Sequence, residues 1–377
     1  MTTLRTQGKL LWLTFAFGML AIFIFAGPVR AQSVKDLPPA PPPWKAKPTP
    51  TPKPAEPEVL DVVKVESNLV MVPVSVTNTV DGQPVQGLQA ADFRLEEEGK
   101  LREIAQIGDP EQIPLDIAIL FDVSSSVSQK GFFVFQQNAA AAFLKQVMKP
   151  IDKAAVFTIA SEPKMVQALA PAETAAARIL AIPAATSSVP TAFYDTVAAA
   201  AHYLSENSPD RHRRVIVVLS DGDDNFSERI RDLSVAEARA AMKGEETPQA
   251  ALVSLQDRHR RAVIDLQHTI LKADVTFYSV NPGGRSVELN LISTRAQNGM
   301  HAVAEASGGS AFIPDSDQEL ERVFRQVASE LRGQYLLQYY ADADVTPGQF
   351  RKISVSVPSR QQIKVRSRQG YYAKKGK

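Results

Sequence analysis

The sequence predicts an α/β fold: a doubly wound (Rossmann-like), mostly parallel sheet that is inserted in or flanked by a small all-β, sandwich-like domain. From residue 113 onward, apolar strand-like runs alternate with helical runs, which is typical of a parallel sheet covered by helices on both faces. Before and after this region, short segments alternate polar and apolar residues, as half-buried antiparallel strands do. At 377 residues the chain is long enough for two domains.

The N-terminal residues predict export to the periplasm or the extracellular space. Arg5 and Lys9 precede an apolar run over 10–26, and Ala31 ends a small-residue cleavage motif. This pattern is that of a secretory signal peptide over 1–31, with an uncleaved membrane anchor as the alternative. Cleavage would remove three of the 42 basic residues and none of the 41 acidic ones, so the protein would be nearly neutral. Nucleic-acid binding requires a strongly basic face and is not expected.

The chain contains no cysteine, which excludes disulfides and thiolate metal sites. A proline-rich linker is predicted over 32–58, because "DLPPAPPPWKAKPTPTPKPAEP" has no apolar period, with a disordered leader as the alternative. Strands are expected to begin in the segment 59–110, first at "NLVMVPVSVTN", before a hairpin signal at Asp81-Gly82. "ADFRLEEEG" and "KLREIAQIG" supply two further strands that meet at Gly99. This segment is too small to form a stable sandwich by itself.

The α/β domain is predicted over 111–332. Its strands are expected at 115–121, 154–159, 215–219, 275–280 and 311–313. Its helices are expected at 131–148, 172–180, 191–204 and 294–306. A last helix is expected to begin at the capping box Ser316-Asp317-Gln318-Glu319 and to end at Gly333.

A helical insertion is predicted at about 227–272, because more than 50 residues separate two strands that one helix would normally connect. Its first helix has a capping box at Ser234 and Glu237 and ends near Gly244. Its second helix has Thr247 as N-cap and Pro248 at the first helical position. One apolar face of this second helix is expected to pack mostly on the sheet: Leu252, Leu255, Ala262, Val263, Leu266 and Ile270. The two histidines of this helix, His259 and His268, are expected to be surface or packing residues.

Strands return in the last segment, 333–377, at "QYLLQYY", "FRKISVSV" and "QQIKVRSR". Neither β segment suffices alone, so we expect the two to join into one sandwich, with the α/β domain inserted between them. Oppositely charged residues on the two segments are candidates for cross-strand pairs, with solvated charge as the alternative: Glu96, Glu97 and Glu98 against Arg351, Lys352, Lys364 and Arg366.

Oxygen-bearing side chains follow the predicted strand ends. Asp122, Ser124 and Ser126 come directly after the first strand, and Asp221 follows another strand. Thr191 stands at the start of a predicted helix between them. Doubly wound sheets bind ligands outside the carboxyl ends of their strands, and hydroxyl and carboxylate oxygens suit Mg²⁺, Mn²⁺ or Ca²⁺. The sequence therefore predicts a divalent-metal site.

The ordered set Asp122-x-Ser124-x-Ser126, Thr191 and Asp221 resembles the metal-ion-dependent adhesion site (MIDAS) of von Willebrand factor type A domains. The resemblance implies that Ser124 and Ser126 bind the metal directly, with Mg²⁺ as the first expectation. It implies that Thr191 binds directly or through water, and that Asp122 and Asp221 act mainly through bound water. Neutral hydroxyls leave the cation poorly neutralised, so an acidic side chain of a protein partner would complete its coordination. The family thus implies a binding and adhesion-type module, not an enzyme.

The resemblance covers about 113–331, and the flanking β segments look like those of secreted bacterial proteins of this type. One departure is "SSVPTAF", where the family commonly has glycines before the threonine. The first alternative is a structural or envelope-assembly scaffold with a degenerate site, in which the serines only cap a helix. A metal-assisted hydrolase is the second alternative, although the chain has no Gly-x-Ser-x-Gly, His-Glu-x-x-His or P-loop motif. The neighbouring Asp223, Asp224 and Asn225 are expected to form a solvated loop, with a role in supporting the metal ligands as the alternative.

Overall fold

The computed structural model describes residues 69–374, apart from 125–132, 186, 188, 234–236, 238, 240–241, 245–246, 283–290 and 343–345. The described residues belong to one compact unit, Lys64–Lys377. The predicted signal peptide (1–31) and proline-rich linker (32–58) lie outside them. Within the described part of the chain, no helix has the length and apolar character needed to cross a membrane.

A six-stranded sheet forms the centre of the α/β region, in the order β10-β9-β8-β5-β6-β7. Its strands are β5 (Leu115–Asp122), β6 (Lys153–Ile159), β7 (Lys164–Ala170), β8 (Arg213–Leu219), β9 (Val275–Val280) and β10 (Ala311–Phe312). Neighbouring strands pair in parallel, except that β7 pairs antiparallel with β6. The five predicted strands are all present, whereas the edge strand β7 was not predicted.

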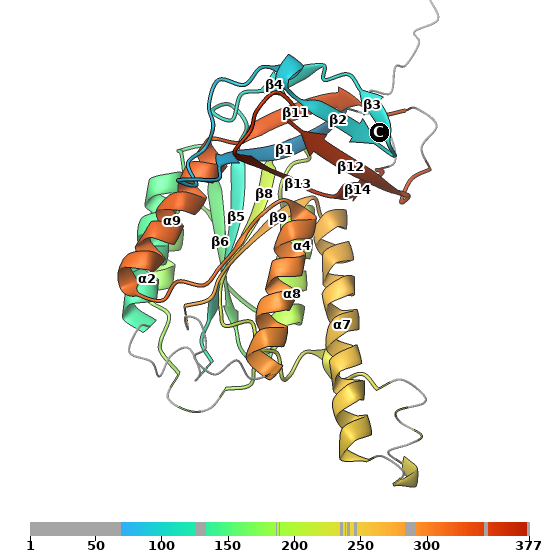
Figure 1. The fold of residues 1–377 in the computed structure, drawn as a ribbon. Coiled ribbons are helices and arrows are strands. Elements are labelled where there is room, and N and C mark those ends of the chain that lie inside the picture. The colour runs from blue at the N-terminus through green and yellow to red at the C-terminus, as the bar shows by residue number, and fades with distance from the viewer. Residues whose placement is uncertain are drawn as a thin grey trace, which may run out of the picture. The chain divides into compact units, whose positions relative to one another are not determined.

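Helices cover both faces of this sheet, as Figure 1 shows. One face carries α2 (Phe133–Val147), α3 (Ala172–Leu180) and α9 (Asp317–Arg332). The other carries α4 (Phe193–Asn207), α7 (Pro248–Lys272) and α8 (Leu291–Ser307). Every residue of β5 is buried, with Ile117 and Ile119 in the first apolar core and Ala118 and Leu120 in the second. The doubly wound sheet is thereby confirmed.

The helix ends follow the predicted capping residues closely. The Thr247 side chain accepts a hydrogen bond from the Ala250 N–H at 3.2 Å, with proline next in the chain, so α7 begins as expected. The Ser316 hydroxyl accepts from the Glu319 N–H at the start of α9. Ser234, the predicted N-cap of the first insertion helix, lies outside the described residues.

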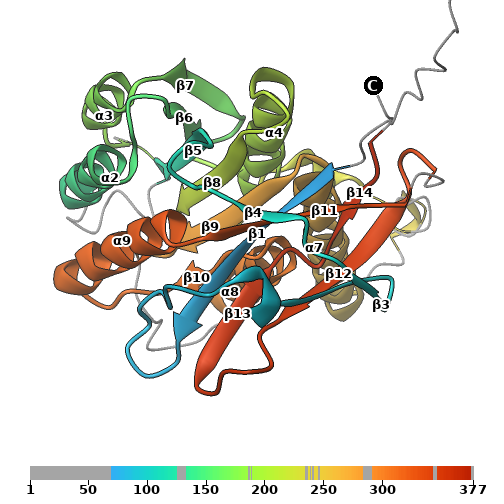
Figure 2. The same ribbon diagram turned by 90° about the horizontal axis from the view of Figure 1, so that it is seen from above.

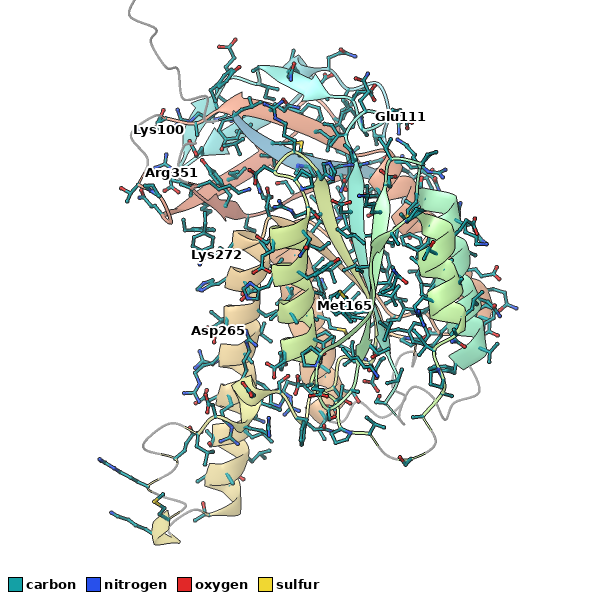
Figure 3. All side chains as sticks on the ribbon, turned by 180° about the vertical axis from the view of Figure 1, so that it is seen from behind. Lys100, Glu111, Met165, Asp265, Lys272 and Arg351 are labelled. Atoms are coloured by element: carbon teal, nitrogen blue, oxygen red, sulfur yellow. The ribbon has the colours of Figure 1, made fainter. Side chains whose placement is uncertain are left out.

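Only the C-terminal half of α7 packs as predicted. Ala262, Leu266 and Ile270 are fully buried against the sheet. Leu252 is exposed, contrary to expectation, because the N-terminal half of the helix runs past the end of the sheet (Figure 1). The solvent-facing side of the packed half bears Asp265 and Lys272 (Figure 3).

Two four-stranded antiparallel sheets lie beyond the amino ends of the central strands, in the orders β13-β1-β11-β4 and β14-β12-β2-β3. The N-terminal strands are β1 (Leu69–Asn78), β2 (Arg94–Glu97), β3 (Lys100–Arg102) and β4 (Gln106–Gly108). The C-terminal strands are β11 (Tyr335–Tyr340), β12 (Phe350–Ser356), β13 (Ile363–Ser367) and β14 (Gly370–Tyr372). A short 3-10 helix, η1 (Ala90–Asp92), precedes β2.

The two β segments are interleaved, as expected. β1 pairs with both β11 and β13, and β2 pairs with β12 (Figure 2). Their buried side chains share one apolar core, which includes Val72, Leu95, Leu337 and Ile353. Each segment therefore supplies the partners that the other lacks. The finer domain boundaries at 59–110, 111–332 and 333–377 stay predictions.

The expected charge pairs between the segments form only in part. Arg351 lies 3.4 Å from the fully buried Glu97, and Arg102 lies 2.7 Å from the same carboxylate. Arg366 instead pairs with Glu330 of α9. The latter contact joins the sandwich to the α/β region.

Candidate metal-binding site

Two adjacent strands of the central sheet end in polar residues at the same edge. β5 ends at Asp122 and leads to Ser124, while β8 leads to Ser220 and Asp221. The two strands pair in parallel, with Phe121 opposite Leu219, so their carboxyl ends meet. The chain runs from β5 to β6 and β7 on one side and returns to β8 on the other, which makes this a topological switch point.

Asp122 is the hydrogen-bonding centre of this edge. Its carboxylate is fully buried and accepts the Ser124 backbone N–H at 2.7 Å, and the Ser124 hydroxyl also bonds to it. Its other oxygen accepts the Ser220 hydroxyl at 2.5 Å. The Ser220 oxygen in turn accepts the Gly222 N–H at 2.9 Å. A single carboxylate therefore holds both strand ends together.

Negative charge is concentrated at this edge. Burial raises the pKa of Asp122 to about 6, and the nearby charge of Asp221 adds to the effect. Burial and Asp221 also raise the pKa of Asp223. A cation would relieve this repulsion, and the carboxylate and hydroxyl oxygens present are the ligands that hard divalent cations prefer. The residues of the edge therefore fit a divalent cation such as Mg²⁺.

Thr191 belongs to the same set of connected loops. It is buried, and its backbone N–H donates to the Asn225 side chain at 2.8 Å. Its carbonyl accepts the N–H groups of Asn225 and Phe226, each at 3.1 Å. The N–H of the next residue, Ala192, donates to the carbonyl of Ala160, directly after β6. The loop before α4 is thus bonded to the loops that follow two strands of the sheet.

The expectation that Asp224 is solvated is wrong. Its buried carboxylate accepts from the N–H groups of Tyr194, Phe226 and Ser227 and from the Ser227 hydroxyl, at 2.6–3.1 Å. The physical reason is at the start of α4, where Ala192 has no side chain that can cap the helix. Asp224 supplies that cap from another loop, and α4 accordingly begins at Phe193, two residues later than predicted.

Four of the five predicted ligands therefore lie on hydrogen-bonded loops at one edge of the sheet: Asp122, Ser124, Thr191 and Asp221. The fifth, Ser126, lies outside the described residues. Within the described ranges no group of three or more His, Asp or Glu is arranged as metal ligands. The proposed ligand set contains only two carboxylates, so binding of a cation would depend on its hydroxyl groups as well.

Two residues of this edge were not predicted. Ser220 directly precedes Asp221, and its position at the end of an apolar strand was the available signal. Arg295 of α8 forms an ion pair with Asp223 at 3.7 Å. No sequence pattern pointed to Arg295, because about 70 residues separate it from the loop it contacts.

The chain matches a known protein family. The model of the von Willebrand factor type A domain matches residues 116–309. No curated protein matches the chain.

Solved structures with a similar fold include proximal thread matrix protein 1 from the mussel byssus, with its MIDAS motif occupied by zinc. It is 15% identical, with a TM-score of 0.40, over 62% of this chain and 49% of that one. The chain thus spans about half the length of the mussel protein. The PilB minor pilin from Streptococcus sanguinis is 12% identical, with a TM-score of 0.40, over 59% of this chain and 62% of that one. BatB from Bacteroides thetaiotaomicron is 13% identical, with a TM-score of 0.34, over 57% of this chain and 98% of that one.

Proposed function

The chain belongs to the von Willebrand factor type A domain family, and on that premise we propose that it is an exported binding module that recognises a protein partner through a divalent cation. The observation that carries the proposal is the joining of two strand ends at the buried carboxylate of Asp122. Around it, hydroxyl and carboxylate oxygens meet at the switch point of the sheet, where such folds bind ligands.

We assign the cation to Asp122, Ser124, Ser126, Thr191 and Asp221. The serine hydroxyls would bind it directly, Thr191 directly or through water, and the two carboxylates mainly through water. Mg²⁺ is the cation proposed, with Mn²⁺ and Ca²⁺ as alternatives of the same hard-ligand class. The bound cation would supply positive charge and an open coordination position for an acidic side chain of the partner.

Binding is favoured over catalysis by the surroundings of the site. A metal-assisted hydrolase needs a general base or an activated nucleophile beside the cation. Among the described side chains, no imidazole hydrogen-bonds to the proposed ligands. His212 bonds to Asp116 at the opposite end of β5, and His259 lies 3.3 Å from the Tyr194 hydroxyl. The stronger competitor is a scaffold whose metal site is degenerate.

Thermal melting of metal-free protein distinguishes these functions. A cation that binds only the folded state stabilises it, by about 2.7 kcal/mol at a concentration 100 times its Kd, which raises the Tm by about 5 °C or more. We expect Mg²⁺ to produce this rise in the chelator-treated protein and in an Asp232→Asn control at an exposed carboxylate. Asp221→Asn, which has nearly the same shape, should abolish it. Identical melts with and without Mg²⁺ in the unsubstituted protein would favour the scaffold.

A second experiment addresses the partner. Partner capture from envelope extract should succeed in Mg²⁺ and fail in chelator. A partner retained equally in both conditions would place recognition away from the cation.

A further inference from the structure

We propose that Arg295 acts as a counter-charge at the edge of the sheet that carries the proposed metal ligands. Its guanidinium neutralises Asp223 when the divalent cation is absent, and its positive charge lowers the affinity of the site for that cation. This inference rests on the proposed function. Arg295 lies outside the proposed ligand set, and its charge would control the affinity of the site for the cation.

The contact between α8 and the loop after β8 provides the geometric basis. Arg295 reaches from the first turns of α8 to within 3.7 Å of Asp223. The side chains of Arg295 and Asp223 are 21% and 35% exposed, so the pair is partly shielded from water. Among the described residues, Arg295 is the basic side chain that forms an ion pair with the stretch 221–225.

The packing of α8 against the loop after β8 holds Arg295 beside Asp223. Gly222 has a φ of +75°, and a Cβ atom on it would lie 2.7 Å from the Met300 side chain. Met300 is on α8, less than two turns from Arg295. The same helix therefore covers the Asp221-Gly222 turn with an apolar side chain and places a guanidinium beside the next carboxylate.

The negative charges of the neighbouring carboxylates are stabilised in different ways. Asp224 accepts four hydrogen bonds, and Asp122 accepts bonds from Ser124 and Ser220, all from uncharged donors. These bonds satisfy the oxygens but do not cancel their charge. Asp221 and Asp223 are carboxylates two positions apart on one loop, so their negative charges repel each other. Arg295 forms an ion pair with Asp223 and thereby offsets one of these charges.

The nearby histidine does not add a second positive charge near neutral pH. His259 is buried beside Tyr194, and burial, followed by the charges of Arg295 and Arg258, lowers its pKa to about 4. Arg295 thus contributes a full charge from this side of the edge while His259 contributes none.

Two effects follow from this arrangement. Removing the Arg295 charge leaves Asp223 without its ion-pair partner, so the cation-free protein should melt at a lower temperature. The same change makes the edge more negative, so a divalent cation should bind more tightly, by about tenfold for a unit charge acting near a partly buried ion. A merely structural ion pair would give the first effect without the second.

The test is calorimetric titration of the full metal-free chain with Mg²⁺ alone, combined with melting in chelator. Arg295→Met should lower the Kd about tenfold, and Arg295→Lys, which keeps the charge, should stay within about twofold of the unsubstituted protein. Asp223→Asn should raise the Kd severalfold. The double variant should return towards the unsubstituted value, because one positive and one negative charge are removed together. Arg295→Gln, which keeps hydrogen-bonding capacity, replaces Arg295→Met if the latter fails to fold.

The outcomes separate the two proposals. If the unsubstituted protein binds Mg²⁺ and neither Arg295→Met nor Arg295→Gln changes its Kd, the counter-cation is refuted while the proposed function stands. If the unsubstituted protein binds no Mg²⁺, both are refuted. Tighter binding in the neutral variants, with a lower Tm in chelator, supports the inference.

Discussion

The Ser220 hydroxyl donates a hydrogen bond to Asp122 across 2.5 Å and thereby joins the ends of β8 and β5. The two residues are 98 positions apart in the chain, and both are fully buried. Their contact fixes the start of the loop that carries Asp221, because the same Ser220 oxygen accepts the Gly222 N–H. The position of one proposed ligand thus depends on a residue that is not itself a proposed ligand.

Ser220→Ala should therefore destabilise the protein and weaken cation binding together. A hydrogen bond to a charged group contributes about 1.5–3 kcal/mol, and Asp122 would be left with one fewer donor while still buried. We expect the free energy of unfolding in urea to fall by about 2 kcal/mol. Ser205→Ala, at an exposed position of α4, is the matched control and should leave stability unchanged. Equal stability of the two variants would show that the contact contributes little.

His259 should make stability depend on pH in the acidic range. Burial, aided by Arg295 and Arg258, lowers its pKa to about 4, whereas an unfolded histidine titrates near 6.5. The unfolded chain then binds more protons between these values, so this contribution is fully present above about pH 6.5 and is lost as pH falls towards 4. The loss amounts to up to about 3 kcal/mol.

The measurement compares urea unfolding at pH 7.5 and pH 5. His259→Gln should lose less stability between these two conditions than the unsubstituted protein does. His202→Gln, at an exposed site on α4, should show the full loss. If all three proteins lose the same free energy of unfolding between pH 7.5 and pH 5, His259 is not buried in its neutral form.

Glu97 should be the most sensitive charged residue of the sandwich. It contacts Arg102 and Arg351 and accepts the Tyr371 hydroxyl at 2.7 Å. Burial opposes its ionisation, but Tyr371 and the two arginines outweigh burial and lower its pKa. Because loss of one partner leaves buried charge uncompensated, Glu97→Gln should cost about 3 kcal/mol in urea unfolding.

Glu96 provides a control one residue away. It is half-buried and pairs with the exposed Arg94, so Glu96→Gln should cost about 1 kcal/mol or less. Similar losses at both positions would argue that the sandwich does not depend on its buried ion pairs.

The central strands could be predicted because helices cover both faces of the sheet, so their residues are mostly apolar. Residues 215–219 form a continuous apolar run, and β8 contains all of them, buried throughout. β7 escaped prediction because it is an edge strand with mostly half-exposed or exposed residues and a register shift against β6. The exposure of Leu252 was missed because the apolar period of α7 continues beyond the sheet that buries it.

Part of the candidate site could likewise be predicted from the sequence, and part could not. Asp122, Ser124, Thr191 and Asp221 could be placed from strand ends and the order of polar residues. The role of Asp224 could not, since it caps a helix that begins about 30 residues earlier. Such contacts depend on how loops from distant parts of the chain pack together, which periodicity does not reveal.

The most direct test of the shared cation is anomalous X-ray diffraction from crystals of the protein soaked with Mn²⁺, a cation of the same ligand class that is visible at its absorption edge. One strong peak is expected in contact with the Ser124 hydroxyl and beside Asp221, with no such peak in Asp221→Asn crystals. A peak elsewhere, or none at this edge under conditions where Mn²⁺ binds, would contradict the proposed cation site.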